Sequence, residues 1–242
     1  MTYTAQEIEK GLTDPDKKIR WEWAKSMHWT PTPEQIERGL SDNVWYIREA
    51  WALRMDFTPT PEQIERGLTD DKEEVRWKWA RRLDFTPTSK QVERGLQDEE
   101  SRVREAWGQR TDFHPTPEQV ERGLTDSAFA VKLAWIRRTD YTPTPEQIER
   151  GLTDKDWIIR KAWAERTDYT PTPEQIERGV SIEHPDIEIA WLSRHDIIWT
   201  DAQIQRGLQS SYKSTRKIWE NILYRQREQH TEASDSVYME SI

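Results

Sequence analysis

Apolar and polar positions along this chain repeat at a fixed interval of 28 residues. Every repeat has a glycine that is preceded seven residues earlier by threonine and followed twelve residues later by tryptophan. A fixed period of this length is typical of proteins built from stacked supersecondary units. The eight glycines of the series are Gly11, Gly39, Gly67, Gly95, Gly123, Gly151, Gly179 and Gly207.

The first half of each repeat predicts a short helix, as in residues 60–68. Thr60 is suited to the N-cap, Pro61 to the first helical position, and Gln63 completes a capping box. Gly67, near the end of this helix, is compatible with two structures. It permits either a left-handed cap or the close approach of a neighbouring helix.

The second half of each repeat predicts another helix, as in residues 70–82. Val75 and Trp79 are four residues apart and therefore share one face, which we expect to be buried. The proline-containing link 84–88 predicts a stiff corner. Because isolated helices shorter than about 12–15 residues are marginal in water, the hairpins must stack to be stable.

These patterns predict an all-α fold, an α-solenoid of eight 28-residue helical hairpins that form a right-handed superhelix. Residues 228–242 lack the repeat and predict an acidic, disordered tail that could be a cap, a regulatory segment or a short linear motif. The single solenoid is predicted to occupy residues 1–227, with repeats at 4–31, 32–59, 60–87, 88–115, 116–143, 144–171, 172–199 and 200–227.

The segment from Leu12 to Arg20, with an aspartate, an aliphatic residue five positions later and an arginine six positions later, resembles the signature of HEAT-like repeats. The resemblance is to the short phycobilisome-lyase-type and leucine-rich-variant-like helical repeats. It implies a ladder between adjacent repeats that joins Asp14, Asp42, Asp70, Asp98, Asp126 and Asp154 to Arg20, Arg48, Arg76, Arg104 and Arg160. The pattern changes at four positions, Lys132, Ile182, Glu188 and Ser210.

The charge balance is acidic but mixed. The net charge is −9, of which residues 228–242 contribute −4. Because nucleic-acid binding requires a basic face, we do not expect this chain to bind nucleic acid directly. A column of arginines recurs, and each lies two residues before an aspartate, which predicts pairing within the chain. The column is Arg54, Arg82, Arg110, Arg138, Arg166 and Arg194.

The sequence offers little for catalysis or for a cofactor. Cysteine is absent, which excludes disulfides, thiolate nucleophiles and cysteine-ligated metals. The five histidines occupy unrelated repeat positions, and no phosphate-binding glycine loop is present. We therefore expect no enzyme activity, cofactor or metal site. No apolar run of 18 residues and no export signal are visible, so we expect a cytoplasmic protein without membrane contact.

Positions that differ between repeats are the best candidates for function. The variable positions lie on the second helix, six, seven and ten residues after each glycine, and several carry large apolar groups. Clustered exposed aromatics indicate a binding surface. The alternative is that some of them extend the core or cover the seam to the next hairpin. The candidate partner-binding residues are Trp21, Trp45, Tyr46, Trp77, Phe129, Leu133, Trp157 and Ile158.

Two functions are compatible with these patterns. The first is a non-enzymatic scaffold or inhibitor that binds another protein along the solenoid surface. The alternative is an acidic decoy that imitates nucleic acid and blocks a nucleic-acid-binding protein. Neither the identity of the partner nor the oligomeric state follows from the sequence.

Overall fold

The computed structural model describes residues 3–181 and 184–239, with side chains as far as Glu228, and within these residues all regular structure is helical. The chain divides into two compact units, unit 1 (Met1–Asp140) and unit 2 (Tyr141–Ile242). Unit 1 holds five hairpins, formed by α1 (Ala5–Leu12), α2 (Lys17–Lys25), α3 (Pro33–Leu40), α4 (Trp45–Ala52), α5 (Pro61–Leu68), α6 (Glu73–Ala80), α7 (Ser89–Gly95), α8 (Ser101–Gly108), α9 (Pro117–Leu124) and α10 (Phe129–Ile136).

Unit 2 holds three hairpins built on the same plan. Its helices are α11 (Pro145–Leu152), α12 (Trp157–Glu165), α13 (Pro173–Ser181), α14 (Pro185–Leu192), α15 (Asp201–Gly207) and α16 (Lys213–Met239). The predicted all-α solenoid of helical hairpins is therefore confirmed, and the direction of its superhelical twist stays a prediction.

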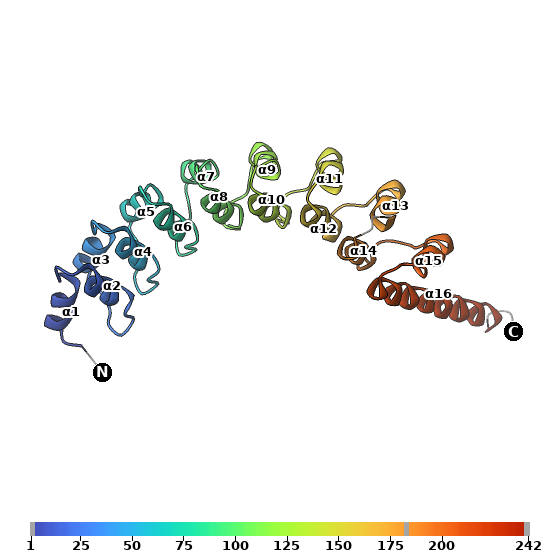
Figure 1. Cartoon of the computed structure of the whole chain (residues 1–242), viewed down its shortest axis with the longest axis horizontal. Helices are drawn as coiled ribbons and strands as arrows, with labels where there is room; N and C mark the ends of the chain where they lie inside the picture. Colours follow the sequence, from blue (N-terminus) through green and yellow to red (C-terminus); the bar gives the residue numbers. More distant parts are fainter. Residues whose placement is uncertain (1–2, 182–183, 240–242) are drawn as a thin grey trace. The chain divides into compact units, whose positions relative to one another are not determined.

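The hairpins stack so that their helices form two layers. In unit 1, first helices lie in one layer and second helices in the other (Figure 1). Second helices of neighbouring hairpins pack directly against one another, α2 on α4, α4 on α6, α6 on α8 and α8 on α10. In unit 2, α12 packs on α14 and α14 packs on α16. The second helices thus form the continuous element of each unit.

Each first helix begins at its predicted threonine. In α5 the Thr60 side chain accepts a hydrogen bond from the backbone N–H of Gln63, and the Gln63 side chain accepts one from the backbone N–H of Thr60. The same reciprocal pair is present at every first helix, with Glu7 in place of glutamine in α1. The predicted capping boxes are confirmed.

The repeated glycine supports close packing within the hairpin. Among the described residues no glycine has a positive φ, so the left-handed cap is wrong for Gly67 and its equivalents. A Cβ atom added to Gly67 would lie 2.1 Å from Nε1 of Trp79. Trp79 itself is only 1% exposed, and Val75 is equally buried. The interval of twelve residues between glycine and tryptophan is therefore the spacing of two groups in direct contact.

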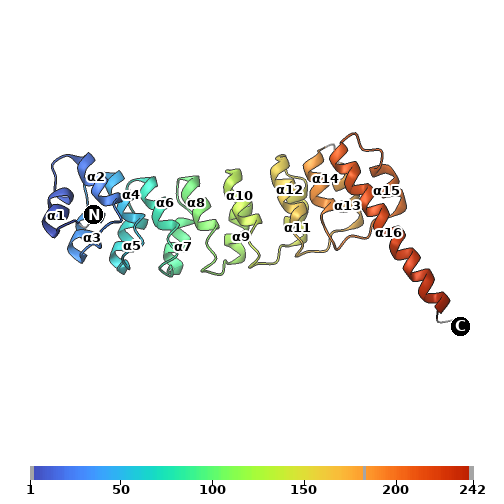
Figure 2. The same cartoon turned by 90° about the horizontal axis from the view of Figure 1, so that it is seen from below.

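The last helix is much longer than the others. α16 extends from Lys213 to Met239 and continues past its hairpin partner α15 (Figure 2). Its backbone differs from the disorder predicted for residues 228–242 as far as Met239, and residues 240–242 lie outside the described residues. Residues 213–239 contain neither glycine nor proline, so no residue that breaks a helix interrupts this segment.

We expect Gly67→Ala to destabilise the protein although alanine favours helices. The added Cβ would overlap the Trp79 ring, which is enclosed by the core, and overpacking of this kind costs about 2–3 kcal/mol. Urea unfolding of Gly67→Ala in the wild-type and Trp79→Ala backgrounds measures the effect. With the ring removed, the same substitution should cost nothing or stabilise by up to about 1 kcal/mol. An equal cost in both backgrounds would contradict the contact.

Candidate functional site

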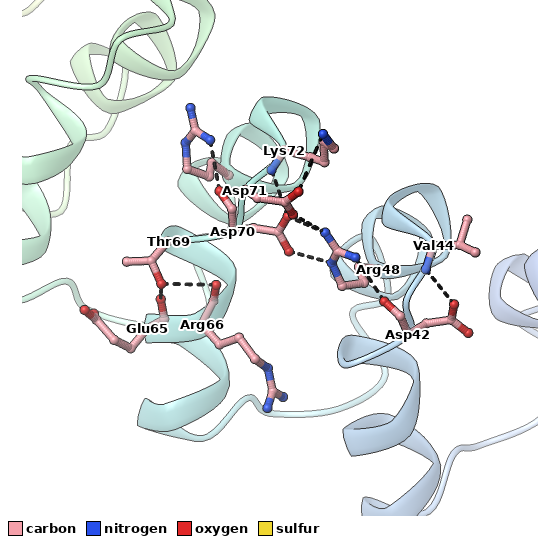
Figure 3. Close-up of polar contacts among 10 residues, drawn as sticks. Asp42, Val44, Arg48, Glu65, Arg66, Thr69, Asp70, Asp71 and Lys72 are labelled. Atoms are coloured by element: carbon pink, nitrogen blue, oxygen red, sulfur yellow. Dashed lines mark hydrogen bonds and ion pairs between the residues drawn. The ribbon is translucent and has the colours of Figure 1, made fainter.

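An Asp–Arg ladder joins successive hairpins along the turns that precede the second helices. Arg48 donates from Nε and Nη2 to the Asp70 carboxylate at 2.6 Å each and from Nη1 to the Asp42 carbonyl at 3.0 Å (Figure 3). These hydrogen bonds to Asp70 raise the pKa of Arg48. Asp70 also accepts from the backbone N–H of Lys72, so one carboxylate stabilises the turn before α6 and binds the neighbouring hairpin.

The ladder that the HEAT-like resemblance implies is present throughout unit 1 and changes in unit 2. In unit 2, Arg160 donates to the carbonyl of Asp154, but Ile182, where the next aspartate would stand, lies outside the described residues. Glu188 replaces the arginine of the seventh repeat, is buried, and accepts from Trp219 Nε1 at 2.9 Å. The four pairs of unit 1 are Arg20 with Asp42, Arg48 with Asp70, Arg76 with Asp98, and Arg104 with Asp126.

A column of buried arginines, the bridging arginines, connects the ends of the second helices. Arg82 donates from Nη1 to the carbonyls of Ala52 and Arg54 in the preceding hairpin, at 2.9 and 2.7 Å. Its other nitrogens bind both oxygens of Asp84, and its guanidinium lies 4.9 Å from the ring centre of Phe57. The predicted pairing within the chain is confirmed at all six positions, Arg54, Arg82, Arg110, Arg138, Arg166 and Arg194.

A third set of ion pairs, the Glu–Arg ladder, lies on the first helices. Glu37 accepts from Arg66 at 2.7 and 3.0 Å and from Gln63 at 3.1 Å. These hydrogen bonds, that of Arg66 foremost, lower the pKa of Glu37 to about 2. Further pairs of this ladder include Glu9 with Arg38, Glu65 with Arg94, Glu93 with Arg122, Glu149 with Arg178, and Glu177 with Arg206. Most charged side chains that recur in the repeats thus form ion pairs within the protein.

None of the predicted partner-binding residues belongs to the buried core. Phe129 is 51% exposed and Trp157 is 38% exposed. The other six are half-buried: Trp21, Trp45, Tyr46, Trp77, Leu133 and Ile158. The structure therefore leaves all eight within reach of solvent, and their role in binding stays a prediction.

Trp21 and Trp77 fit the alternative interpretation, in which an aromatic ring covers the seam to the next hairpin. Trp21 contacts Tyr46 of the second hairpin edge-to-face, with ring centres 6.4 Å apart. The guanidinium of Arg102, from the fourth hairpin, lies 3.5 Å from the ring centre of Trp77. Each ring also supports a cation of its own helix, Lys25 above Trp21 and Arg81 above Trp77.

Phe129 and Leu133 meet at a groove between α8 and α10, the α8–α10 groove, with a volume of about 590 Å³. Its floor includes Gly108, the one glycine outside the 28-residue series, where four other repeats have alanine. The Gly108 carbonyl accepts a hydrogen bond from the bridging arginine Arg138 at 3.0 Å, which fixes the floor. Arg137 and other polar residues form the rim. The position of this glycine outside the series is the sequence feature that could have indicated the groove, although Gly108 is not among the predicted binding residues.

In unit 2, Trp157 is covered on one face by a neighbouring side chain. Its ring stacks on His184 of the next hairpin, with centres 4.4 Å apart and planes inclined by 23°. Ile158 lies beside it at the start of α12 and is half-buried. Trp157 therefore combines a partly exposed edge with a contact that closes the seam.

A further group of exposed apolar residues is not among the predicted binding residues. These residues lie fourteen and sixteen positions after the glycines, where the second helix ends, whereas the prediction compared positions six, seven and ten. Met27, Leu53, Met55 and Leu83, from the first three hairpins, are each between 55% and 67% exposed. Alignment at these two later positions would have found them. At the sixteenth position the eight repeats have Met27, Met55, Leu83, Thr111, Thr139, Thr167, His195 and Leu223.

Within the described part of the chain, no three histidine, aspartate or glutamate side chains are grouped so as to hold a metal ion. Of the helices in this part, none has both the length and the apolar character required to span a bilayer. Neither a known protein family nor a curated protein matches the chain. The geometry of its surfaces is therefore the basis for a functional proposal.

The Glu–Arg ladder predicts a specific loss of stability in acid. The pKa of Glu37 falls from an ordinary 4.5 to about 2 in the folded protein, so its contribution is complete above pH 4.5 and is lost as the pH falls toward 2. Because Glu37 is half exposed, we expect less than about 1 kcal/mol from it. Urea unfolding at pH 5.5 and pH 3 should show a smaller decrease for Glu37→Gln than for wild type.

Glu22→Gln is the matched control for this measurement, since Glu22 is an exposed carboxylate outside the ladder. It should keep the wild-type dependence on pH. Equal pH dependence in Glu37→Gln and wild type would exclude a contribution of this ladder to acid stability.

Proposed function

We propose that this protein is a non-enzymatic scaffold or inhibitor that binds another protein through the exposed surface of its second helices. The observation that carries the proposal is the α8–α10 groove. A phenylalanine that is 51% exposed, Phe129, borders a concave floor formed by Gly108 and Ala134. Binding energy at protein interfaces concentrates where a large apolar group adjoins such a pocket.

The rigidity of the frame supports this proposal. Arg138 holds the carbonyl of Gly108 and pairs with Asp140, and Trp135 is buried beneath Gly108. A surface held in this way loses little conformational entropy on binding. Arg137 at the rim adds a charge that can select the orientation of a partner.

The acidic-decoy alternative has no specific observation in its favour. A decoy of nucleic acid needs unneutralised carboxylates, whereas the recurring carboxylates here bind arginine in the Asp–Arg and Glu–Arg ladders and beside the bridging arginines. The relationship to HEAT-like repeats and a cytoplasmic location are parts of our proposal.

The absence of cysteine supports the proposed location, because a chain without cysteine gains no disulfide from an oxidising compartment.

The proposal requires that Phe129 contribute little to folding. We expect Phe129→Ser to lower the free energy of unfolding by less than about 1 kcal/mol, because half of the side chain is already in water. Val131, two residues later on α10 and 2% exposed, provides the comparison. Val131→Ser should cost about 2–4 kcal/mol in urea unfolding. Similar losses for the two variants would assign Phe129 to the core instead.

The binding role itself is tested by site-specific cross-linking in cells of the source organism. A photoreactive phenylalanine analogue at position 129 should give a discrete protein adduct, whereas the analogue at Lys90, exposed on the first-helix layer, should not. The complex should survive about 0.5 M salt, since screening weakens charged contacts more than apolar ones. It should be lost in Leu133→Ser. Absence of an adduct, or loss of the complex in salt, contradicts an apolar protein contact at this groove.

A further inference from the structure

Exposed apolar residues form an ordered row where the second helices of the first three hairpins, α2, α4 and α6, end. Met27, Met55 and Leu83 occupy the same position in three consecutive hairpins of unit 1, and we call these three residues the corner row. Leu53, two residues before Met55, is 55% exposed. Thr111 ends the row in the fourth hairpin.

The bridging arginines fix the spacing of this row. Arg54 donates from Nη1 to the carbonyl of Ser26, adjacent to Met27, at 2.6 Å. Arg82 donates in the same way to the carbonyl of Arg54, adjacent to Met55, at 2.7 Å. Three consecutive corners are therefore joined by hydrogen bonds of the bridging arginines, one repeat apart. Packed helices lie roughly 8–10 Å from one another, which sets the separation along the row.

Positive charge flanks the row. Lys25 and Arg81 are exposed at the position that Leu53 occupies in the second hairpin. Their cationic groups lie 3.9 and 4.9 Å from the ring centres of Trp21 and Trp77, which explains two of the predicted aromatics as supports for these cations. The aspartates that directly follow Met55 and Leu83, Asp56 and Asp84, are each bound at both oxygens by a bridging arginine.

We propose that the corner row binds an acidic amphipathic helix of a partner protein, with one apolar residue in every seven. Seven residues of α-helix rise about 10.5 Å and return nearly to the same face, so successive heptads match successive corners. Acidic residues beside the apolar stripe face Lys25 and Arg81. The methionines suit such a site because their side chains adapt to the partner's shape. The inference rests on the proposed protein-binding function but uses other residues: the corner row ends at Leu83, and Thr111, the next residue at this repeat position, lines the α8–α10 groove.

The test uses a synthetic helix of three heptads, locked by a hydrocarbon link on its far face, with one leucine per heptad flanked by glutamates. Fluorescence anisotropy measures its binding to the full chain. Met55→Ser with Leu83→Ser should weaken binding at least tenfold. Ile198→Ser is the matched control, because Ile198 is 92% exposed in unit 2 but belongs to no row, and it should leave the affinity unchanged.

Three further arms test spacing and charge. A peptide of the same composition with its leucines spread around the helix should bind at least tenfold more weakly. Thr111→Leu, which extends the row to a fourth hairpin, should tighten the binding of a four-heptad peptide about threefold or more. Lys25→Gln with Arg81→Gln should slow association and reduce its dependence on salt.

The proposal is overturned if the three-heptad peptide does not bind, if leucine spacing has no effect, or if Ile198→Ser weakens binding as much as the row variant. Sedimentation with vesicles of phosphatidylserine and phosphatidylcholine provides the competing outcome. Vesicle binding that is lost in the row variant, without peptide binding, would assign the row to a lipid surface. Phe129→Ser separates the two proposals, since it should leave peptide binding unchanged while removing the partner captured at the groove.

Discussion

The contact between a tryptophan ring and the glycine of the same hairpin determines how the two helices of every repeat meet. The ring occupies the space where a Cβ atom would lie, at 2.0–2.5 Å from it in all eight repeats. The first helix can therefore lie directly on the indole ring, and the two short helices pack against each other through this ring. Neither helix has the length to be stable alone, so this contact makes the hairpin a unit that can stack.

Stacking then depends on polar groups that are satisfied only by the next hairpin. The carbonyl groups at the end of each second helix lack partners within the helix, and a bridging arginine such as Arg82 supplies them from the following repeat. The arginine is buried, but its charge is balanced by Asp84 and by the face of Phe57. Because removing either partner would leave a buried group unpaired, the register between hairpins is strongly specified.

The sequence predicts features that every repeat needs and misses those that depend on neighbours. Caps, helix order and the tryptophan core follow from spacing, and the pairing of Arg54 with Asp56 follows from their proximity. The role of Gly67 could not be decided, since both a left-handed cap and a close contact use glycine. Whether Trp77 binds a partner or supports a cation depends on Arg102, which is 25 residues away. The extension of α16 shows that a polar composition alone does not indicate the absence of a helix.

The exposed corner residues are not required for the stacking of the hairpins. Thr111 and Thr139 occupy the same position as Met55 and Leu83, and the bridging arginines Arg110 and Arg138 keep their hydrogen bonds beside threonine. An apolar side chain at this position is therefore unnecessary for stacking. A large apolar group in water gains nothing for folding and favours association. Its presence in three consecutive hairpins, beside cations that lie on tryptophan rings, is the reason that we propose a partner helix which buries it.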